Sequence, residues 1–221
     1  MMRIGIDVNG VLRDTIGKFD QLYTKHLIEK DEDELTNQTY ELDSSGNTKL
    51  IEVNIDPFEY QKISEVTSLK LDDHYSFRSQ EELFSFMYEE YAMELFGHAP
   101  SSEMTTFNML NDFYLDNRDN SEILIVSSEI GKSKPSTLFF LSKFGCLLEK
   151  IVFYGEITKN QMWDQVDILL TANPSLLLEK NKNKIVIKYK TTYNENIDSE
   201  YEIDSLSDLN QIIIKIKENV I

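Results

Sequence analysis

The stretch RIGIDVNGVLRDT, residues 3–15, joins an apolar run to a turn and to the start of a helix. Its first half, through Val8, predicts a buried strand, and Asn9-Gly10 is a turn signal directly after it. Asp14-Thr15 is a candidate N-cap, and apolar residues follow it at helical spacing. The start of the chain therefore predicts a strand, a tight loop and a helix, in that order.

Four later apolar runs have the same character as the first. They lie at residues 122–128, 151–154, 166–171 and 184–189, and helices are predicted at 135–144 and from Pro174. Most of these runs are apolar throughout, which is typical of parallel strands that are covered on both faces. The alternation of strands and helices therefore predicts an α/β fold with a Rossmann-like, doubly wound parallel sheet.

A long insertion separates the first predicted strand from the second. Residues 81–96 place apolar side chains on one broad face of a helix that Gly97 would end, and another helix is predicted to begin at Ser101. Residues 35–80 are polar and give no clear pattern. We predict an α/β core formed by residues 1–15 plus 118–221, with a mainly helical cap inserted at residues 16–117.

The chain of 221 residues is strongly acidic, with 22 basic and 39 acidic residues and a net charge of −17. That charge argues against a nucleic acid or a membrane surface as partner, and no apolar run reaches the roughly 18 residues of a membrane span. The single cysteine and the absence of a secretory-signal pattern predict a cytoplasmic protein. Abundant Lys, Ile and Asn, whose codons are AT-rich, suggest an AT-rich genome; for a viral source, the expected location is host cytoplasm or the virion.

Polar residues follow three of the predicted strands. Asp7 and Asn9 come after the first strand, Ser127 ends the second, and Thr171 ends the strand at 166–171, with Ala172 next. The carboxyl ends of parallel strands meet at one edge, where open α/β sheets bind ligands. The sequence therefore predicts a binding or catalytic site at this edge.

Two further motifs carry less weight. Asp72-Asp73-His74 contains metal-ligating residue types, but three adjacent polar residues in a loop are more typical of a solvated surface. Gly131-Lys132-Ser133 lacks the upstream glycine of a phosphate-binding loop, because Val126 stands at that position.

Residues 7–15, DVNGVLRDT, resemble the first motif of the haloacid dehalogenase-like phosphohydrolases, Asp-x-Asp-Gly-Val-Leu-x-Asp-[Thr/Ser]. Ser127 matches the second motif, Lys134 (or less closely Lys132) the third, and residues 169–174, LLTANP, align with the fourth. Tyr193-Asn194 is similar to a pair near the end of the 5′(3′)-deoxyribonucleotidase-like branch. The resemblance covers the predicted core, and the cap is assigned by its position alone.

The resemblance implies a specific phosphatase chemistry. Asp7 would attack phosphorus to form an aspartyl-phosphate, and a second acid two residues later would protonate the leaving group. Ser127 and Lys134 would bind the phosphate oxygens. Mg²⁺ would be held by Asp7, by the backbone carbonyl of the residue at position 9 and by the acids of the fourth motif.

This sequence departs from the pattern at both acidic positions. Asn9 replaces the second acid, and an amide cannot transfer a proton at neutral pH. Thr171 and Ala172 stand where the fourth-motif acids would be, so Asp7 is the one obvious anionic metal ligand and Mg²⁺ binding is weakened. Asp167 and Asp164 lie too early along the strand to substitute. We interpret this as a degraded active site.

Three hypotheses follow for function. The first is a catalytically impaired protein of this fold, a pseudoenzyme used as a binding or structural module, for example a phage virion or assembly component. The second is an active Mg²⁺-dependent phosphohydrolase that acts on (deoxy)nucleoside monophosphates through Asp7. The third is a sensor that closes on a phosphate-bearing ligand without turnover. The expected partner is a phosphorylated small molecule or another protein.

Overall fold

The computed structural model describes residues 1–36, 38–42, 48–53, 58–179 and 184–220. The strands are β1 (Met2–Asp7), β2 (Gln38–Leu42), β3 (Thr48–Val53), β4 (Ser121–Ser127), β5 (Ile151–Phe153), β6 (Ile168–Thr171), β7 (Ile185–Tyr189) and β8 (Tyr201–Ile203). The α-helices are α1 (Thr15–Thr36), α2 (Gln80–Ser85), α3 (Ala92–Phe96), α4 (Thr106–Asn117), α5 (Ser133–Lys143), α6 (Lys159–Trp163), α7 (Pro174–Leu178) and α8 (Leu209–Val220).

The main sheet has six parallel strands in the order β5-β4-β1-β6-β7-β8. This confirms the predicted doubly wound parallel sheet. Strand β1 lies between β4 and β6, and Asp7 pairs in register with Val126. The ends of these three strands therefore come together at one edge. Strand β8 was not predicted, because its three residues are too short to show a period.

Both faces of the sheet are covered, which explains why the strands are apolar throughout. Ile123 and Ile125 belong to a cluster that includes residues of α4, α5 and α8. Leu124 and Val126, the intervening residues, pack in a second cluster with residues of α6 and α7. Since successive side chains of a strand point to opposite faces, each face has its own helical layer.

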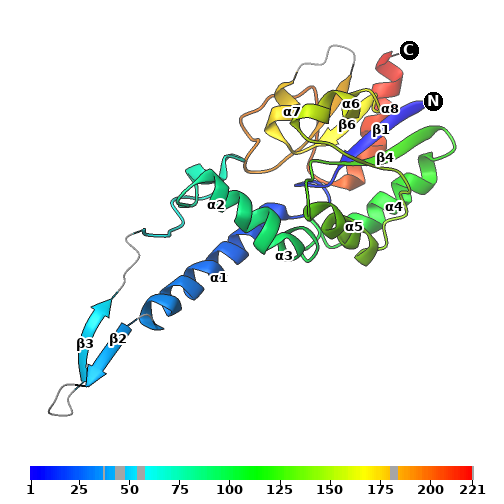
Figure 1. Ribbon diagram of the computed structural model, residues 1–221. Helices are drawn as coiled ribbons and strands as arrows, with labels where there is room; N and C mark the ends of the chain where they lie inside the picture. Colours follow the sequence, from blue (N-terminus) through cyan, green and yellow to red (C-terminus); the bar gives the residue numbers. More distant parts are fainter. Residues whose placement is uncertain (37, 43–47, 54–57, 180–183, 221) are drawn as a thin grey trace.

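The insertion forms its own aromatic cluster. Helix α1 runs away from the sheet toward the antiparallel hairpin β2–β3, while α2 and α3 lie beside its first half (Figure 1). Phe19 packs against Tyr75 and Phe86, with ring centroids 4.8 and 5.3 Å away. Helix α4 also belongs to the inserted segment, but its Phe107 and Leu110 pack in the cluster that covers the sheet. The exact division into core 1–15 plus 118–221 and cap 16–117 stays a prediction.

The predicted single helix at 81–96 is interrupted. Helix α2 is followed by a π-helical turn, η2 (Phe86–Glu90), and Tyr91 has a non-helical backbone before α3 begins. The rings of Phe86 and Tyr91 pack 4.7 Å apart, and the Tyr91 hydroxyl donates to Glu29 of α1. Tertiary packing of Tyr91 thus accompanies a break that helical periodicity alone does not reveal. In the described part of the chain, no helix is long and apolar enough to cross a membrane.

Candidate functional site

Asp7 ends β1 in the middle of the sheet and is only 2% exposed. The Thr171 hydroxyl, at the end of β6, donates to Asp7 Oδ2 over 2.7 Å. Asp7 Oδ1 is also buried and lacks a hydrogen-bond partner among the described residues. Burial raises the pKa of Asp7 to about 7, and the hydrogen bond from Thr171 opposes part of that rise. At neutral pH this carboxyl is therefore only partly ionised.

The loop after Asp7 is a compact turn that carries the next polar residues back over the sheet. The backbone amides of Leu12 and Arg13 both donate to the Val8 carbonyl at 3.0 Å. Gly10 has a φ of 77°, which favours glycine. A Cβ at Gly10 would lie 1.9 Å from the Tyr193 hydroxyl oxygen, so the close approach of Tyr193 also requires glycine.

The first turn of α1 is capped as the sequence predicts. Asp14 directly precedes the helix, and its Oδ1 accepts a hydrogen bond over 2.9 Å from the amide of Gly17, which lies in the first turn. This satisfies one of the free amides at the helix start.

Arg13 is a central residue of the site that the sequence analysis missed. Its side chain is fully buried and forms an ion pair with the equally buried Glu129, with Nη2 2.5 Å from Oε1. Nη1 donates to the Phe96 carbonyl at 2.6 Å and to the Thr137 hydroxyl at 2.7 Å. The guanidinium also lies 5.3 Å from the ring centroid of Phe140. Arg13 thus joins the β1–α1 loop to the end of α3 and to α5.

Asn9 is held inside this network by both ends of its amide. Its Oδ1 accepts from Arg13 Nη2 at 2.6 Å and from the Thr15 hydroxyl at 2.8 Å. Its Nδ2 donates to Glu129 Oε1 at 3.3 Å. The cation on one side and the carboxylate on the other fix the amide orientation. An aspartate at this position would bring a second carboxylate against Glu129, so the amide fits where the acid would not.

The two predicted phosphate-binding residues are not brought together at a pocket. Ser127 is buried, and its hydroxyl donates to Glu129 Oε1 over 3.2 Å. Lys134 is exposed at the start of α5, with Nζ 5.8 Å from the ring centroid of Phe153. Lys132, the alternative, is exposed as well. Their proposed role in binding phosphate stays a prediction.

A pocket of about 150 Å³ opens beside Asp7. Its polar wall is formed by Asp7, Asn9, Thr15, Ser128, Asn173 and Tyr193. Asp7 is the sole charged side chain among the described residues that line it. The described lining therefore contains no cationic side chain, and the buried Arg13 behind Asn9 is already paired with Glu129.

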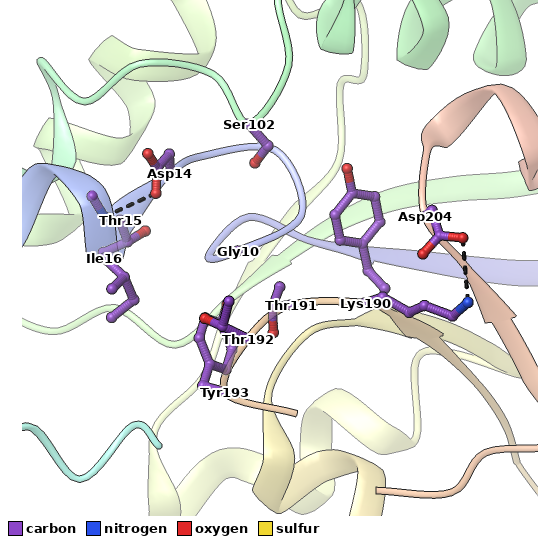
Figure 2. Close-up of a pocket in the computed structure, with 12 residues that line it drawn as sticks. Gly10, Asp14, Thr15, Ile16, Ser102, Lys190, Thr191, Thr192, Tyr193 and Asp204 are labelled. Carbon is purple, nitrogen blue, oxygen red and sulfur yellow. Dashed lines mark hydrogen bonds and ion pairs between the residues drawn. The ribbon is translucent and has the colours of Figure 1, made fainter. Parts of the chain in front are cut away.

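A second pocket, of about 290 Å³, shares Gly10, Thr15, Ile16 and Tyr193 with the first. Figure 2 shows its walls, where Lys190 forms an ion pair with Asp204 over 3.2 Å. Tyr193 thus contributes to both pockets, although the sequence pointed to it only through its resemblance to a terminal motif.

The sequence matches no family model and no curated protein, whereas its structure is similar to solved structures. One is a haloacid dehalogenase-like family hydrolase from Streptococcus pneumoniae, with a TM-score of 0.54 and 10% identity, covering 96% of this chain and 98% of that chain. Another is a haloacid dehalogenase-like hydrolase from Xanthomonas campestris, with a TM-score of 0.51 and 8% identity, covering 99% and 97%. The chain has the haloacid dehalogenase-like fold. At these identities the likeness shows the fold alone.

Hydrolases of the haloacid dehalogenase-like fold generally use Mg²⁺, and the residues at this edge do not fit that ion. Mg²⁺ prefers a set of oxygen ligands with carboxylates among them. Thr171 turns its hydroxyl proton toward Asp7, and Ala172 has no ligand atom in its side chain. Within the described ranges, no group of three His, Cys, Asp or Glu residues is arranged to hold a metal.

Asp164 and Asp167, the two acids that most closely precede the fourth motif in the sequence, lie far from Asp7 in this haloacid dehalogenase-like fold. Asp167 precedes β6 and forms an ion pair with Arg3 over 2.7 Å, at the opposite end of the strands from Asp7. The hydrogen bond from Arg3 lowers the pKa of Asp167 to about 2. The Asp164 carbonyl also accepts from Arg3. Both acids are thus at the wrong end of the sheet, as their sequence positions predict.

Asn194 and His74, the other residues singled out from the sequence, form hydrogen bonds with neighbouring residues. Asn194 is buried, and its Nδ2 donates to the carbonyls of Ala172 and Tyr189, both at 2.9 Å. His74 is also buried, with its ring nitrogens 2.8 and 3.0 Å from the hydroxyls of Ser64 and Ser68. Asn194 therefore ties the loop after β6 to the end of β7. The weak metal hypothesis for 72–74 gains no support from the surroundings of His74.

Proposed function

We propose that this haloacid dehalogenase-like protein has lost efficient phosphoryl transfer and serves as a binding module. The observation that carries the proposal is the position of Asn9 between Arg13 and Glu129. The usual proton-transfer position is occupied by an amide whose acceptor and donor are both engaged. General acid–base catalysis is typically worth about 10² to 10⁴ in rate, and the Asn9 amide cannot supply it.

The state of Asp7 supports the same conclusion. A carboxylate attacks phosphorus only when ionised, and burial keeps the pKa of Asp7 at about 7. Oδ2 is further engaged by the Thr171 hydroxyl. The pocket adds no cation that would neutralise an incoming phosphate, because its described lining contains no Lys, Arg or His. Nucleophile, proton transfer and charge neutralisation are thus all weakened together.

One observation favours the alternative, an active phosphohydrolase that acts on nucleoside monophosphates. Asp7 keeps the position of the nucleophile at the end of the central strand, and its Oδ1 has no hydrogen-bond partner in the described part of the chain. Tyr193 and Asn194, which resemble the deoxyribonucleotidase-like branch, line or adjoin the same edge. This alternative requires a metal whose ligands come from other groups.

Restoring the missing acids tests the proposal. Asn9→Asp alone is expected to stay inactive, because the new carboxylate would face Glu129. Asn9→Asp combined with Glu129→Gln and Thr171→Asp is expected to raise Mg²⁺-dependent release of phosphate from p-nitrophenyl phosphate by about 10² or more. The same combination with Asp7→Asn is the matched control.

Circular dichroism and urea unfolding establish that each variant is folded. A folded combined variant with no gain in phosphate release would contradict the claim that these positions limit the chemistry. Equal gains from Asn9→Asp alone would contradict the role assigned to Glu129.

A further inference from the structure

The pocket beside Asp7 is mainly apolar and partly aromatic. Its apolar wall is formed by Ile16, Leu69, Leu71, Met87, Tyr88 and Phe96. The rings of Tyr88 and Phe96 lie nearly parallel, with centroids 5.3 Å apart. Such a surface suits a small ligand with an apolar body, whose orientation is fixed by a few polar atoms.

The charged group of this pocket is the Asp7 carboxylate, and one of its oxygens is left without a hydrogen bond from the described residues. Asp7 Oδ1 is buried without a hydrogen-bond partner among the described residues, although Asp7 lines the pocket. A buried acceptor left unpaired costs free energy, which a ligand donor would recover. The other polar side chains offer less, because Asn9 and Thr15 bond one another and Asn173 Oδ1 accepts from Ser175.

The charges at the pocket disfavour an anionic ligand. Asp7 and Glu129 carry the negative charges, and Arg13 balances one of them while remaining fully buried. Lys134 is exposed and outside the described lining. A phosphate monoester would therefore enter next to a carboxylate without a cation to receive it. A metal ion would find one carboxylate where it prefers several oxygen ligands.

We propose that this pocket binds a small organic cation, an ammonium group on an apolar or aromatic body, whose N–H donates to Asp7 Oδ1. The ammonium would pair with the one charged side chain of the lining, and the body would lie against the rings of Tyr88 and Phe96. The inference rests on the proposed function, since it gives the ligand class of the same site once turnover is lost.

Isothermal titration calorimetry with three probes of the same body tests the inference. The probes are benzylamine, benzyl alcohol and benzyl phosphate, each titrated at pH 8 into the full chain. We expect benzylamine to bind most tightly, and Asp7→Asn to weaken it by about tenfold to a hundredfold, as the loss of a charged hydrogen bond predicts. Asp119→Asn, an exposed position outside the pocket, is the matched control and should bind like the wild type.

Three results would overturn the inference: tighter binding of benzyl phosphate than of benzylamine, benzylamine binding that Asp7→Asn leaves unchanged, or no binding of any probe. Phosphate release from benzyl phosphate, measured in the same samples, tests the proposed function separately. Release that Asp7→Asn abolishes would overturn the proposed function. Tight binding of benzyl phosphate without release would overturn the ligand class alone.

Discussion

The buried ion pair of Arg13 and Glu129 gives a prediction about stability. Arg13→Met keeps most of the side-chain volume and removes the guanidinium from a site where both partners are fully buried. Glu129 would remain as a buried carboxylate without its cation, and the Phe96 carbonyl and Asn9 Oδ1 would each lose a donor. The variant tests whether this network is a structural centre of the site.

The expected cost follows from the partners that would be stranded. Removing one member of a buried ion pair typically costs about 3–5 kcal/mol in the free energy of unfolding, because the remaining charge is uncompensated. Packing lost against the Phe140 ring adds to this. Since a domain has about 5–15 kcal/mol in total, Arg13→Met should remove a large part of the free energy of unfolding at neutral pH.

Neutralising Glu129 should relieve part of that cost. The double variant Arg13→Met with Glu129→Gln should be more stable than Arg13→Met by at least about 1 kcal/mol, because no buried charge remains unpaired. The measurement is urea unfolding followed by circular dichroism at pH 7. Arg118→Met, at an exposed arginine, is the control and should change stability by less than about 0.5 kcal/mol.

A decrease of less than about 1 kcal/mol in the free energy of unfolding of Arg13→Met would contradict this prediction, because exposed ion pairs contribute in that range. Equal losses for the single and the double variant would refute the claim that the stranded charge of Glu129 is the main cost.

Two further predictions concern Asp7 and Asn194. The folded-state pKa of Asp7 is raised from 3.8 to about 7, so the folded chain binds more protons than the unfolded chain between these values and its stability falls as pH rises through them. Asp7→Asn removes this penalty and should raise the free energy of unfolding by up to about 4 kcal/mol at pH 8 and by much less at pH 4. Urea unfolding at both pH values measures the difference. An equal effect at the two pH values would contradict the raised pKa of Asp7. Asn194→Ala removes the hydrogen bonds to the Ala172 and Tyr189 carbonyls and should lower the free energy of unfolding by about 3 kcal/mol. A decrease of less than about 0.5 kcal/mol in the free energy of unfolding, measured with urea, would show that these hydrogen bonds contribute little to stability.

The meeting of three strand ends at one edge of the sheet could be predicted from sequence because parallel strands obey a simple rule. Apolar runs that end in polar residues place Asp7, Ser127 and Thr171 at one edge, and the structure has the end of β1 between those of β4 and β6. The direction of each side chain was not accessible in the same way. The Ser127 hydroxyl, for example, turns to Glu129, which no strand pattern indicates.

The Arg13–Glu129 pair could not be predicted because its two members are far apart in sequence. Arg13 follows an apolar pair in the first loop, and Glu129 follows two serines after β4. A charged residue in a short loop is usually solvated, so burial of both was not expected from composition. The one available signal is the replacement of an acid by Asn9, which makes room for a carboxylate partner nearby.

The break near Tyr91 has a similar origin. Residues 81–96 keep an apolar face across the interruption, so periodicity predicts one helix. The contact between Tyr91 and Glu29 involves α1, and that contact depends on tertiary structure. Local pattern therefore predicted the element type better than its continuity.

We propose that this protein has lost efficient phosphoryl transfer. The most direct test of this proposal is the release of phosphate from p-nitrophenyl phosphate and a panel of nucleoside monophosphates, with Mg²⁺, for the wild type and for Asp7→Asn in equal amounts of folded protein. We expect equal release of phosphate from the two proteins. Mg²⁺-dependent release by the wild type that is about 10² or more above that of Asp7→Asn would contradict it and identify an active aspartyl-phosphate enzyme.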